Sequence, residues 1–224
     1  MRKVVLGSTL LHFGLLEPEE AVIPWDGKRL LDSSSTEIAD YPGLFSWWSK
    51  AERRWNEHSS GKMTLLQRID YQKLLTMQFP VAHIRVVYAT SGTYLASAVV
   101  EDRSLLCDTK TYWIPVNTLD EGRYLSAILN SDALRQRFEH LQPTGQFGTR
   151  DFHRLPLCPP IPLFDSESDL HQSLTRIYQD ASSQVASMEI TRLGFKNARQ
   201  KIRNDLETNS LRQLNTLVEK LLET

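Results

Sequence analysis

The segment from Gly145 to Arg154 places two glycines among side chains that can bind nucleic acids. Glutamine and arginine form paired hydrogen bonds with the edges of adenine and guanine, while threonine and histidine suit phosphate oxygens. The candidate DNA-binding residues of this loop are Gln146, Thr149, Arg150, His153 and Arg154. The alternative is a surface loop that is anchored by Phe147 and Phe152 and in which Arg150 pairs with Asp151. The residue pattern leaves both interpretations open.

Three further candidates lie in turns near the edge of an expected β-sheet. Ser91 and Thr93 flank Gly92, and Lys110 directly precedes a strand. They rank second because only their turn positions near the sheet edge favour a contact with DNA.

The triplet Asp108-Thr109-Lys110 matches half of a metal-dependent nuclease site. Such a site needs a second carboxylate to share a divalent ion, usually about ten or more residues upstream on a strand. Glu101 and Asp102 lie too close to the triplet for this role. We therefore interpret the triplet as a turn that enters a strand near Thr111. The six histidines show no paired spacing that would hold zinc, so we expect no metal site.

The sequence lacks the motifs that bind S-adenosylmethionine and methylate a base. Its ten glycines include no Gly-x-Gly pair that could bring backbone amides against such a cofactor. The loop Cys158-Pro159-Pro160-Ile161 resembles the Asn/Asp-Pro-Pro-aromatic loop of amino-methyltransferases. However, Cys158 and Ile161 supply neither the polar acceptor nor the stacking ring that this chemistry needs. We expect no catalytic residues and no cofactor site in this chain.

Two other groups of residues have ordinary structural interpretations. Residues 192–203 carry five positive charges and no acid, which favours a solvated helix face over a track for phosphates. Trp47, Trp48 and Trp55 are interpreted as core or interface anchors rather than as platforms for stacked bases.

The elements that must position these residues include both strands and helices. Strand-like runs cover residues 3–16 and 21–31, and apolar spacing predicts one helix from Gly43 to about Asn56 and another over 63–76. Further strands are expected at 84–88, 94–100 and 111–116, with Ser91-Gly92 as a hairpin signal and Pro115 placing the third strand near an edge. Helices at 120–129 and 132–141 and a loop at 142–150 follow.

Residues 166–224 read as helical throughout. Gly194 breaks or kinks this region, and beyond it an apolar seam runs from Ile202 to Leu221. The seam predicts two long helices that pack against each other or against a partner.

The amino-acid composition is typical of a globular protein. The 224 residues include 26 Lys+Arg and 27 Asp+Glu, a formal charge of −1, and 41% are hydrophobic. Near neutrality excludes a histone-like binder that works by bulk positive charge. Two cysteines cannot form a disulfide framework, and no apolar run reaches the ~20 residues of a membrane span. We expect a cytoplasmic α+β protein with no membrane partner, built from a twisted mixed β-sheet, flanking helices and a C-terminal pair of long helices.

An ordered series of short motifs resembles a known family. The series is similar to the C-terminal target-recognition region of bacterial N6-adenine DNA methylases of restriction-modification systems, and more distantly to the recognition domains of type I restriction specificity subunits. Segments around Trp25 and Trp47 resemble the region that precedes this recognition region in the same proteins. The similarity therefore covers most of the chain and fades after about Ser187. The motifs are Arg85-Val86-Val87-Tyr88, Ser91-Gly92-Thr93, Tyr112-Trp113, Arg123-Tyr124-Leu125, Ile128-Leu129-Asn130-Ser131, Gly148-Thr149-Arg150-Asp151-Phe152 and Ile161-Pro162-Leu163-Phe164-Asp165.

The resemblance implies sequence-specific recognition of double-stranded DNA without catalysis by this chain. A separate methyltransferase catalytic domain or subunit would bind S-adenosylmethionine and methylate adenine. The recognition domain would cover residues 1–165, in segments 1–80 and 81–165, and a helical region over 166–224 would act as spacer and docking surface. Two alternatives stay open: a helical scaffolding module that docks a methylase or nuclease subunit through the apolar seam, and a Mg²⁺-dependent nuclease that uses Asp108.

Overall fold

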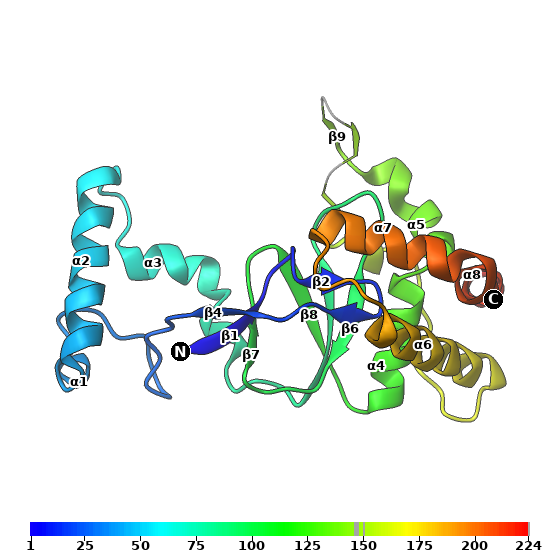
Figure 1. The fold of residues 1–224 in the computed structure, drawn as a ribbon, viewed down its shortest axis with the longest axis horizontal. Coiled ribbons are helices and arrows are strands. Elements are labelled where there is room, and N and C mark those ends of the chain that lie inside the picture. The colour runs from blue at the N-terminus through cyan, green and yellow to red at the C-terminus, as the bar shows by residue number, and fades with distance from the viewer. Residues whose placement is uncertain (146–147, 150, 224) are drawn as a thin grey trace. The chain divides into compact units, whose positions relative to one another are not determined.

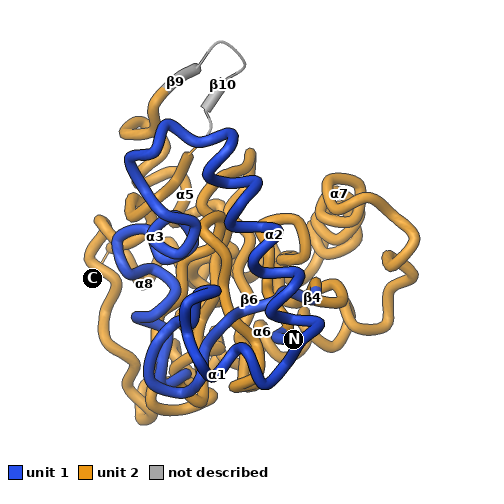
Figure 2. Tube along the Cα trace, turned by 90° about the vertical axis from the view of Figure 1, so that its left-hand side faces the viewer, with its two compact units in different colours: residues 1–2, 20–81 blue, residues 3–19, 82–224 orange. Residues whose placement is uncertain are grey.

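The computed structural model describes residues 1–145, 148–149 and 151–223, without the side chains of 144–150. The chain forms two compact units, which are coloured separately in Figure 2. Unit 1 comprises residues 1–2 and 20–81, and unit 2 comprises residues 3–19 and 82–224. The predicted division at residue 165 stays a prediction.

The central sheet of unit 2 has the strand order β6-β5-β8. Strand β5 (Ile84–Ala89) lies antiparallel to β6 (Ser97–Val100) and to β8 (Thr111–Val116), with Val87 opposite Ala98 on one side and Trp113 on the other. The three predicted strands and the hairpin are therefore confirmed, although β6 begins three residues later than expected. Strand β8, which contains Pro115, is an edge strand as predicted.

The predicted continuous strand over residues 3–16 is wrong. Strand β1 (Arg2–Val5) ends at a turn in which the Leu6 carbonyl accepts the amides of Thr9 and Leu10, and β2 (Leu10–Leu11) then pairs with β3 (Gly14–Leu15). Phe13 makes the tight connection with a φ of +61°. Strand β1 lies parallel to β7 (Leu105–Cys107), which the sequence pattern missed. Strand directions in unit 2 are therefore mixed.

Helices α4 (Leu119–Leu129) and α5 (Asp132–Phe138) confirm two predicted helices, and each begins at a hydroxyl cap. The Thr118 hydroxyl accepts from the Glu121 amide and the Ser131 hydroxyl from the Leu134 amide, both at 3.1 Å. A short helical turn (Glu139–Leu141) follows α5. In the segment predicted as a loop, 142–150, β9 (Thr144–Gly145) pairs with β10 (Gly148–Thr149). A further short helical turn follows at Leu155–Leu157.

The C-terminal part of unit 2 is a pair of long helical runs, as predicted. Helix α6 (Asp169–Ser187) is followed by a break, and Gly194 precedes α7 (Phe195–Leu206), which continues through a π-helical turn (Glu207–Leu211) into α8 (Arg212–Leu222). Figure 1 shows α6 beside α4 and the α7–α8 run extending to the C-terminus. Together with the mixed strands, these helices confirm the α+β class. No helix in the described part of the chain is long and apolar enough to span a membrane.

The apolar seam of the C-terminal helices lies inside the core of unit 2. Its residues pack in one cluster with side chains of β5 and α4, including Val86 and Ile128, and none of them is more than 3% exposed. The seam residues are Ile202, Leu206, Leu211, Leu214, Val218 and Leu221. The C-terminal helices therefore share a core with one side of the sheet, while a second apolar cluster, which includes Val5, Val87 and Leu105, forms separately.

Unit 1 is built mainly from α2 (Pro42–His58), with the short helices α1 (Thr36–Ala39) and α3 (Leu65–Ile69) beside it. Only part of the predicted helix over 63–76 forms, because α3 ends at Ile69. The Asp70 carboxylate accepts from the amides of Leu75 and Thr76 at 3.1 and 2.9 Å, and so stabilises a turn in place of further helix. Two short helical turns follow, at Tyr71–Lys73 and Thr76–Gln78.

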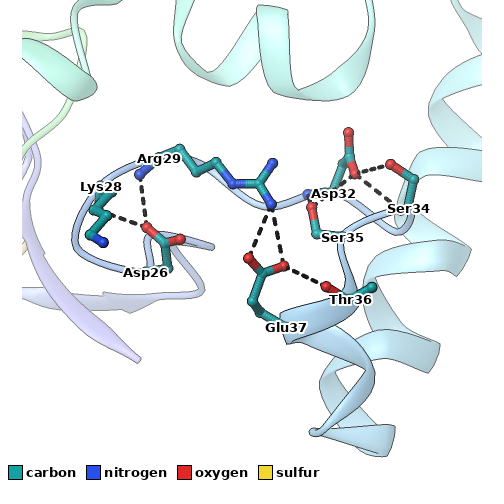
Figure 3. Close-up of polar contacts among 8 residues, drawn as sticks. All are labelled: Asp26, Lys28, Arg29, Asp32, Ser34, Ser35, Thr36 and Glu37. Carbon is teal, nitrogen blue, oxygen red and sulfur yellow. Dashed lines mark hydrogen bonds and ion pairs between the residues drawn. The ribbon is translucent and has the colours of Figure 1, made fainter.

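The predicted strand run over 21–31 is also wrong. After β4 (Glu19–Ala21) the chain forms only an isolated bridge between Trp25 and Leu30 around a turn at Gly27, whose φ is +107°. Figure 3 shows how the polar side chains of this region bond to one another: Asp26 accepts from two amides, Asp32 accepts from the Ser34 hydroxyl, and Arg29 pairs with Glu37. These interactions stabilise the segment of the chain that leads into α1.

Candidate nucleic-acid interface

Three segments that are distant in sequence meet beside the end of β5. The Thr90 amide donates to the Lys110 carbonyl at 3.0 Å, and the Thr90 carbonyl accepts from the Phe152 amide at 2.6 Å. Ser91 forms a β-bridge with Asp151. The backbone therefore brings the β5–β6 loop, the turn before β8 and the segment after β10 into one place.

The segment after β10 is anchored by a buried phenylalanine, and its polar side chains are exposed to solvent. Phe152 is completely buried and meets Phe138 edge-on at 6.0 Å between ring centroids. The Tyr88 hydroxyl donates to the His153 carbonyl at 3.0 Å, and burial raises the pKa of that hydroxyl. His153 takes a φ of +44°, and its exposed ring places Nε2 3.7 Å from the Asp151 carboxylate. The adjoining Arg154 side chain is exposed.

Lys110 lies in a turn that is stabilised by hydrogen bonds to Asp108. The Asp108 carboxylate accepts from the Lys110 amide at 2.9 Å, and the Thr111 hydroxyl donates to the Asp108 carbonyl at 3.1 Å. Burial raises the pKa of the Asp108 carboxyl, against the opposing effect of these amide and hydroxyl donors. A Cβ on Gly7 would lie 3.1 Å from the Lys110 Cβ, so the N-terminal strand also supports the turn. The Lys110 side chain is exposed, as is that of Thr93 in the neighbouring loop.

A cluster of charged and aromatic side chains fixes the loop that carries Ser91 and Thr93. The Arg203 guanidinium carbon lies 3.6 Å from the centre of the Tyr94 ring, and Arg135 lies 5.4 Å from the same ring. Arg203 also pairs with Asp132 at 2.7 Å. Helices α5 and α7 thus hold Tyr94 by cation–π contacts and a partly buried ion pair. Sequence analysis missed this cluster because it joins residues up to 109 positions apart, Tyr94 and Arg203.

Most of the basic segment over 192–203 has partners within the chain. The Arg199 guanidinium donates to the carbonyls of Gly7 and Leu10 at 2.7 Å each, and burial lowers its pKa to about 10. Lys201 pairs with Asp205, and Arg203 with Asp132 as above. Within the described part of this segment, Arg192 and Lys196 are the exposed cations that form no ion pair. The predicted solvated face is therefore wrong for Arg199 and Arg203, whose guanidinium groups bond within the chain and are not free to contact phosphates.

The structure brings together five of the eight candidate residues. Ser91, Lys110 and His153 lie in the segments that bond through Thr90, with Thr93 and Arg154 next to them. Thr149 lies in β10 opposite Thr144, and its side chain is not described. Gln146 and Arg150 lie outside the described residues. The anchoring role expected for Phe152 is confirmed, whereas Phe147 also lies outside the described part.

The structure bears on the residues on which the two alternative functions depend. The apolar seam is buried in unit 2 and so offers no free surface for docking a subunit. Among the described residues, no three His, Cys, Asp or Glu side chains gather where they could hold a metal ion, and Asp108 is bonded to its own turn. Neither observation favours scaffolding through the seam or nuclease chemistry at Asp108.

The tryptophans divide between the core and the surface of unit 1. Trp48 is 1% exposed and its Nε1 donates to Glu52 at 2.9 Å, while the Nε1 of Trp55 donates to the Met63 carbonyl at 2.8 Å. Both fit the predicted anchoring role. Trp47, in contrast, is 51% exposed.

Comparison with known proteins adds no family assignment. No family model matches the chain, and no curated protein matches it.

Proposed function

We propose that this chain is a sequence-specific recognition domain for double-stranded DNA in an N6-adenine DNA methyltransferase of restriction-modification type. A separate catalytic domain or subunit would bind S-adenosylmethionine and methylate the adenine. The chain itself contributes contacts to the duplex and no catalytic group.

The convergence of three polar turns beside the end of β5 is the observation that carries this proposal. Lys110 and Arg154 are exposed cations, and Thr93 and His153 are exposed beside them. Such side chains on supported loops suit contacts to phosphates and to base edges, because a rigid sheet fixes where each one points. The motif series that resembles the methylase recognition region includes the same Ser91-Gly92-Thr93 turn and the segment up to Phe152.

The charge balance sets the expected strength of binding. A formal charge of −1 means that affinity depends on a few positioned cations rather than on the field of the whole chain. Each phosphate that a cation neutralises contributes about 0.9 to the slope of log affinity against log salt. We therefore expect weak, salt-sensitive binding by this chain alone and tighter binding when the catalytic domain is present.

The test is selection of duplexes from a random pool by the isolated chain, followed by affinity measurements on the selected sequence. The double variant Lys110→Gln/Arg154→Gln should bind more weakly and with a salt slope reduced by about 1.8, the value for two lost phosphate contacts. Arg150→Ala and Gln146→Ala test the rest of the predicted loop. A matched control, Arg192→Gln/Lys196→Gln, removes the same charge from exposed positions at the start of α7. Equal affinity and salt slope in all variants would refute the proposed interface.

A further inference from the structure

Helix α2 presents an aromatic and basic row on one face. Trp47, Lys50 and Arg54 follow the spacing i, i+3, i+7, which places them on one side of a helix. Their side chains are exposed, and Trp47 is 51% exposed although tryptophan is usually well buried. The opposite side of α2 packs inward through Trp48, and its Glu52 bonds to Ser33. The outward row is therefore distinct from the face that stabilises unit 1.

The charge around this row is net positive. Residues 41–81 contain six Lys or Arg against three acids, Glu52, Glu57 and Asp70. Glu52 accepts from Trp48, and the Asp70 side chain is 8% exposed, so Glu57 is the one acid of this segment that is fully outward. No ion pair joins Lys50 or Arg54 to an acid anywhere in the described residues. Glu57 follows Arg54 by three residues and so lies on the same face, which leaves the row with two cations and one acid and a net positive charge.

The row is held on a rigid support. Helix α2 begins at Pro42, a residue favoured at the first helical position, and runs for 17 residues. The ring of Trp47 lies against that of Trp48, with centroids 5.7 Å apart, and Trp48 is fixed by its bond to Glu52. Lys50 and Arg54 are separated by about 6 Å along the helix axis, and phosphates of one DNA strand rise by about 3.4 Å each. The spacing of the two cations is therefore close to that of phosphates two steps apart on one strand, which rise by roughly 6.8 Å.

We infer that α2 is a second DNA-contacting surface, in which Lys50 and Arg54 neutralise backbone phosphates and the Trp47 ring packs against the sugar–phosphate backbone beside them. The inference rests on the proposed function in taking duplex DNA as the polyanion, but it concerns residues of unit 1 that lie outside the candidate interface of unit 2. Phosphate contacts of this kind add affinity without sequence preference. The surface would therefore act on DNA that flanks the recognised sequence.

The test uses the full chain with two duplexes that share the selected sequence, one with minimal flanks and one extended by about one helical turn, or roughly 10 base pairs, on each side. Wild type should bind the extended duplex more tightly. The variant Lys50→Gln/Arg54→Gln should lose this advantage, and its salt slope on the extended duplex should fall by about 1.8. The matched control Lys28→Gln/Lys62→Gln removes the same charge from exposed positions of unit 1 off this face and should behave as wild type. Trp47→Phe should remove part of the fluorescence quenching that the extended duplex causes.

The outcomes separate this inference from the proposed function. If the unit 2 variant Lys110→Gln/Arg154→Gln loses affinity while the α2 variant binds both duplexes as wild type does, the second surface is refuted and the recognition function stands. If wild type binds no duplex, both are refuted. Preferential binding of the α2 face to vesicles of anionic lipid, without competition by DNA, would also overturn the inference.

Discussion

Acidification should destabilise unit 2 mainly through the buried side chain of His12. His12 is 1% exposed, and neither of its ring nitrogens has a hydrogen-bond partner among the described residues. Burial, followed by the nearby positive charges of Arg203 and Arg199, lowers its pKa well below the usual 6.5. Folding therefore favours the neutral form of His12.

The direction of the effect follows from where the proton binds. Below a pH of about 6.5 the unfolded chain gains a proton on His12 that the folded chain does not. The stability contributed by neutral His12 is present above that pH and is lost as the pH falls, by up to about 1.4 kcal/mol per pH unit. Between pH 7 and pH 5 the loss from this group reaches about 2 kcal/mol. Burial also lowers the pKa of His171, which adds a loss in the same direction.

The assay is urea unfolding at several pH values between 5.0 and 7.5, followed by far-UV circular dichroism and by fluorescence. Trp113 is the sole tryptophan of unit 2, so the difference in emission between wild type and Trp113→Phe reports on that unit. His12→Leu should flatten the pH dependence, whereas the exposed control His140→Gln should leave it unchanged. Equal losses in wild type and His12→Leu would show that His12 does not differ in protonation between the folded and unfolded states.

Three further outcomes follow from particular contacts. Arg203→Ala should destabilise unit 2 by about 1–2 kcal/mol and speed hydrogen exchange near Tyr94, because its ion pair with Asp132 and its ring contact are lost, while Arg203→Lys should lose less. Asn130→Ala should cost about 2–3 kcal/mol in urea unfolding, because this buried amide makes two hydrogen bonds to Ser97 of β6, of 2.9 and 3.1 Å, and a third of 2.8 Å to the Ser126 carbonyl of α4. A thiol reagent should modify exposed Cys158 in the native chain and buried Cys107, whose pKa is raised by burial to about 11, only after unfolding; two fast equivalents in native buffer would contradict the fold.

Local sequence signals predicted the elements of unit 2 whose formation depends on neighbouring residues. The turn signal at Ser91-Gly92 located β5 and β6, and the two helices predicted after β8 begin at the local hydroxyl caps of Thr118 and Ser131. The N-terminal residues were misread because β2 and β3 depend on distant contacts. Arg199 of α7 holds the Leu10 carbonyl across 189 positions, and no local pattern encodes such a bond.

The candidate interface was predictable in its residues but not in its geometry. Residue types and turn signals selected Ser91, Lys110 and His153 separately, whereas the hydrogen bonds of Thr90 that bring their segments together are long-range. Arg203 was assigned to a solvated face because charge patterning alone does not reveal an acid on another helix. Trp47 was grouped with two inward tryptophans, and only its exposure separates it from them.

The most direct measurement of the central claim is the affinity of the isolated chain for duplexes selected from a random pool, over a range of salt concentrations. We predict enrichment of a defined sequence, with binding that weakens as salt rises and that weakens further in Lys110→Gln/Arg154→Gln but not in Arg192→Gln/Lys196→Gln. A pool that shows no enriched sequence, or a selected duplex that both variants bind as wild type does, would contradict the assignment of DNA recognition to the turns beside β5.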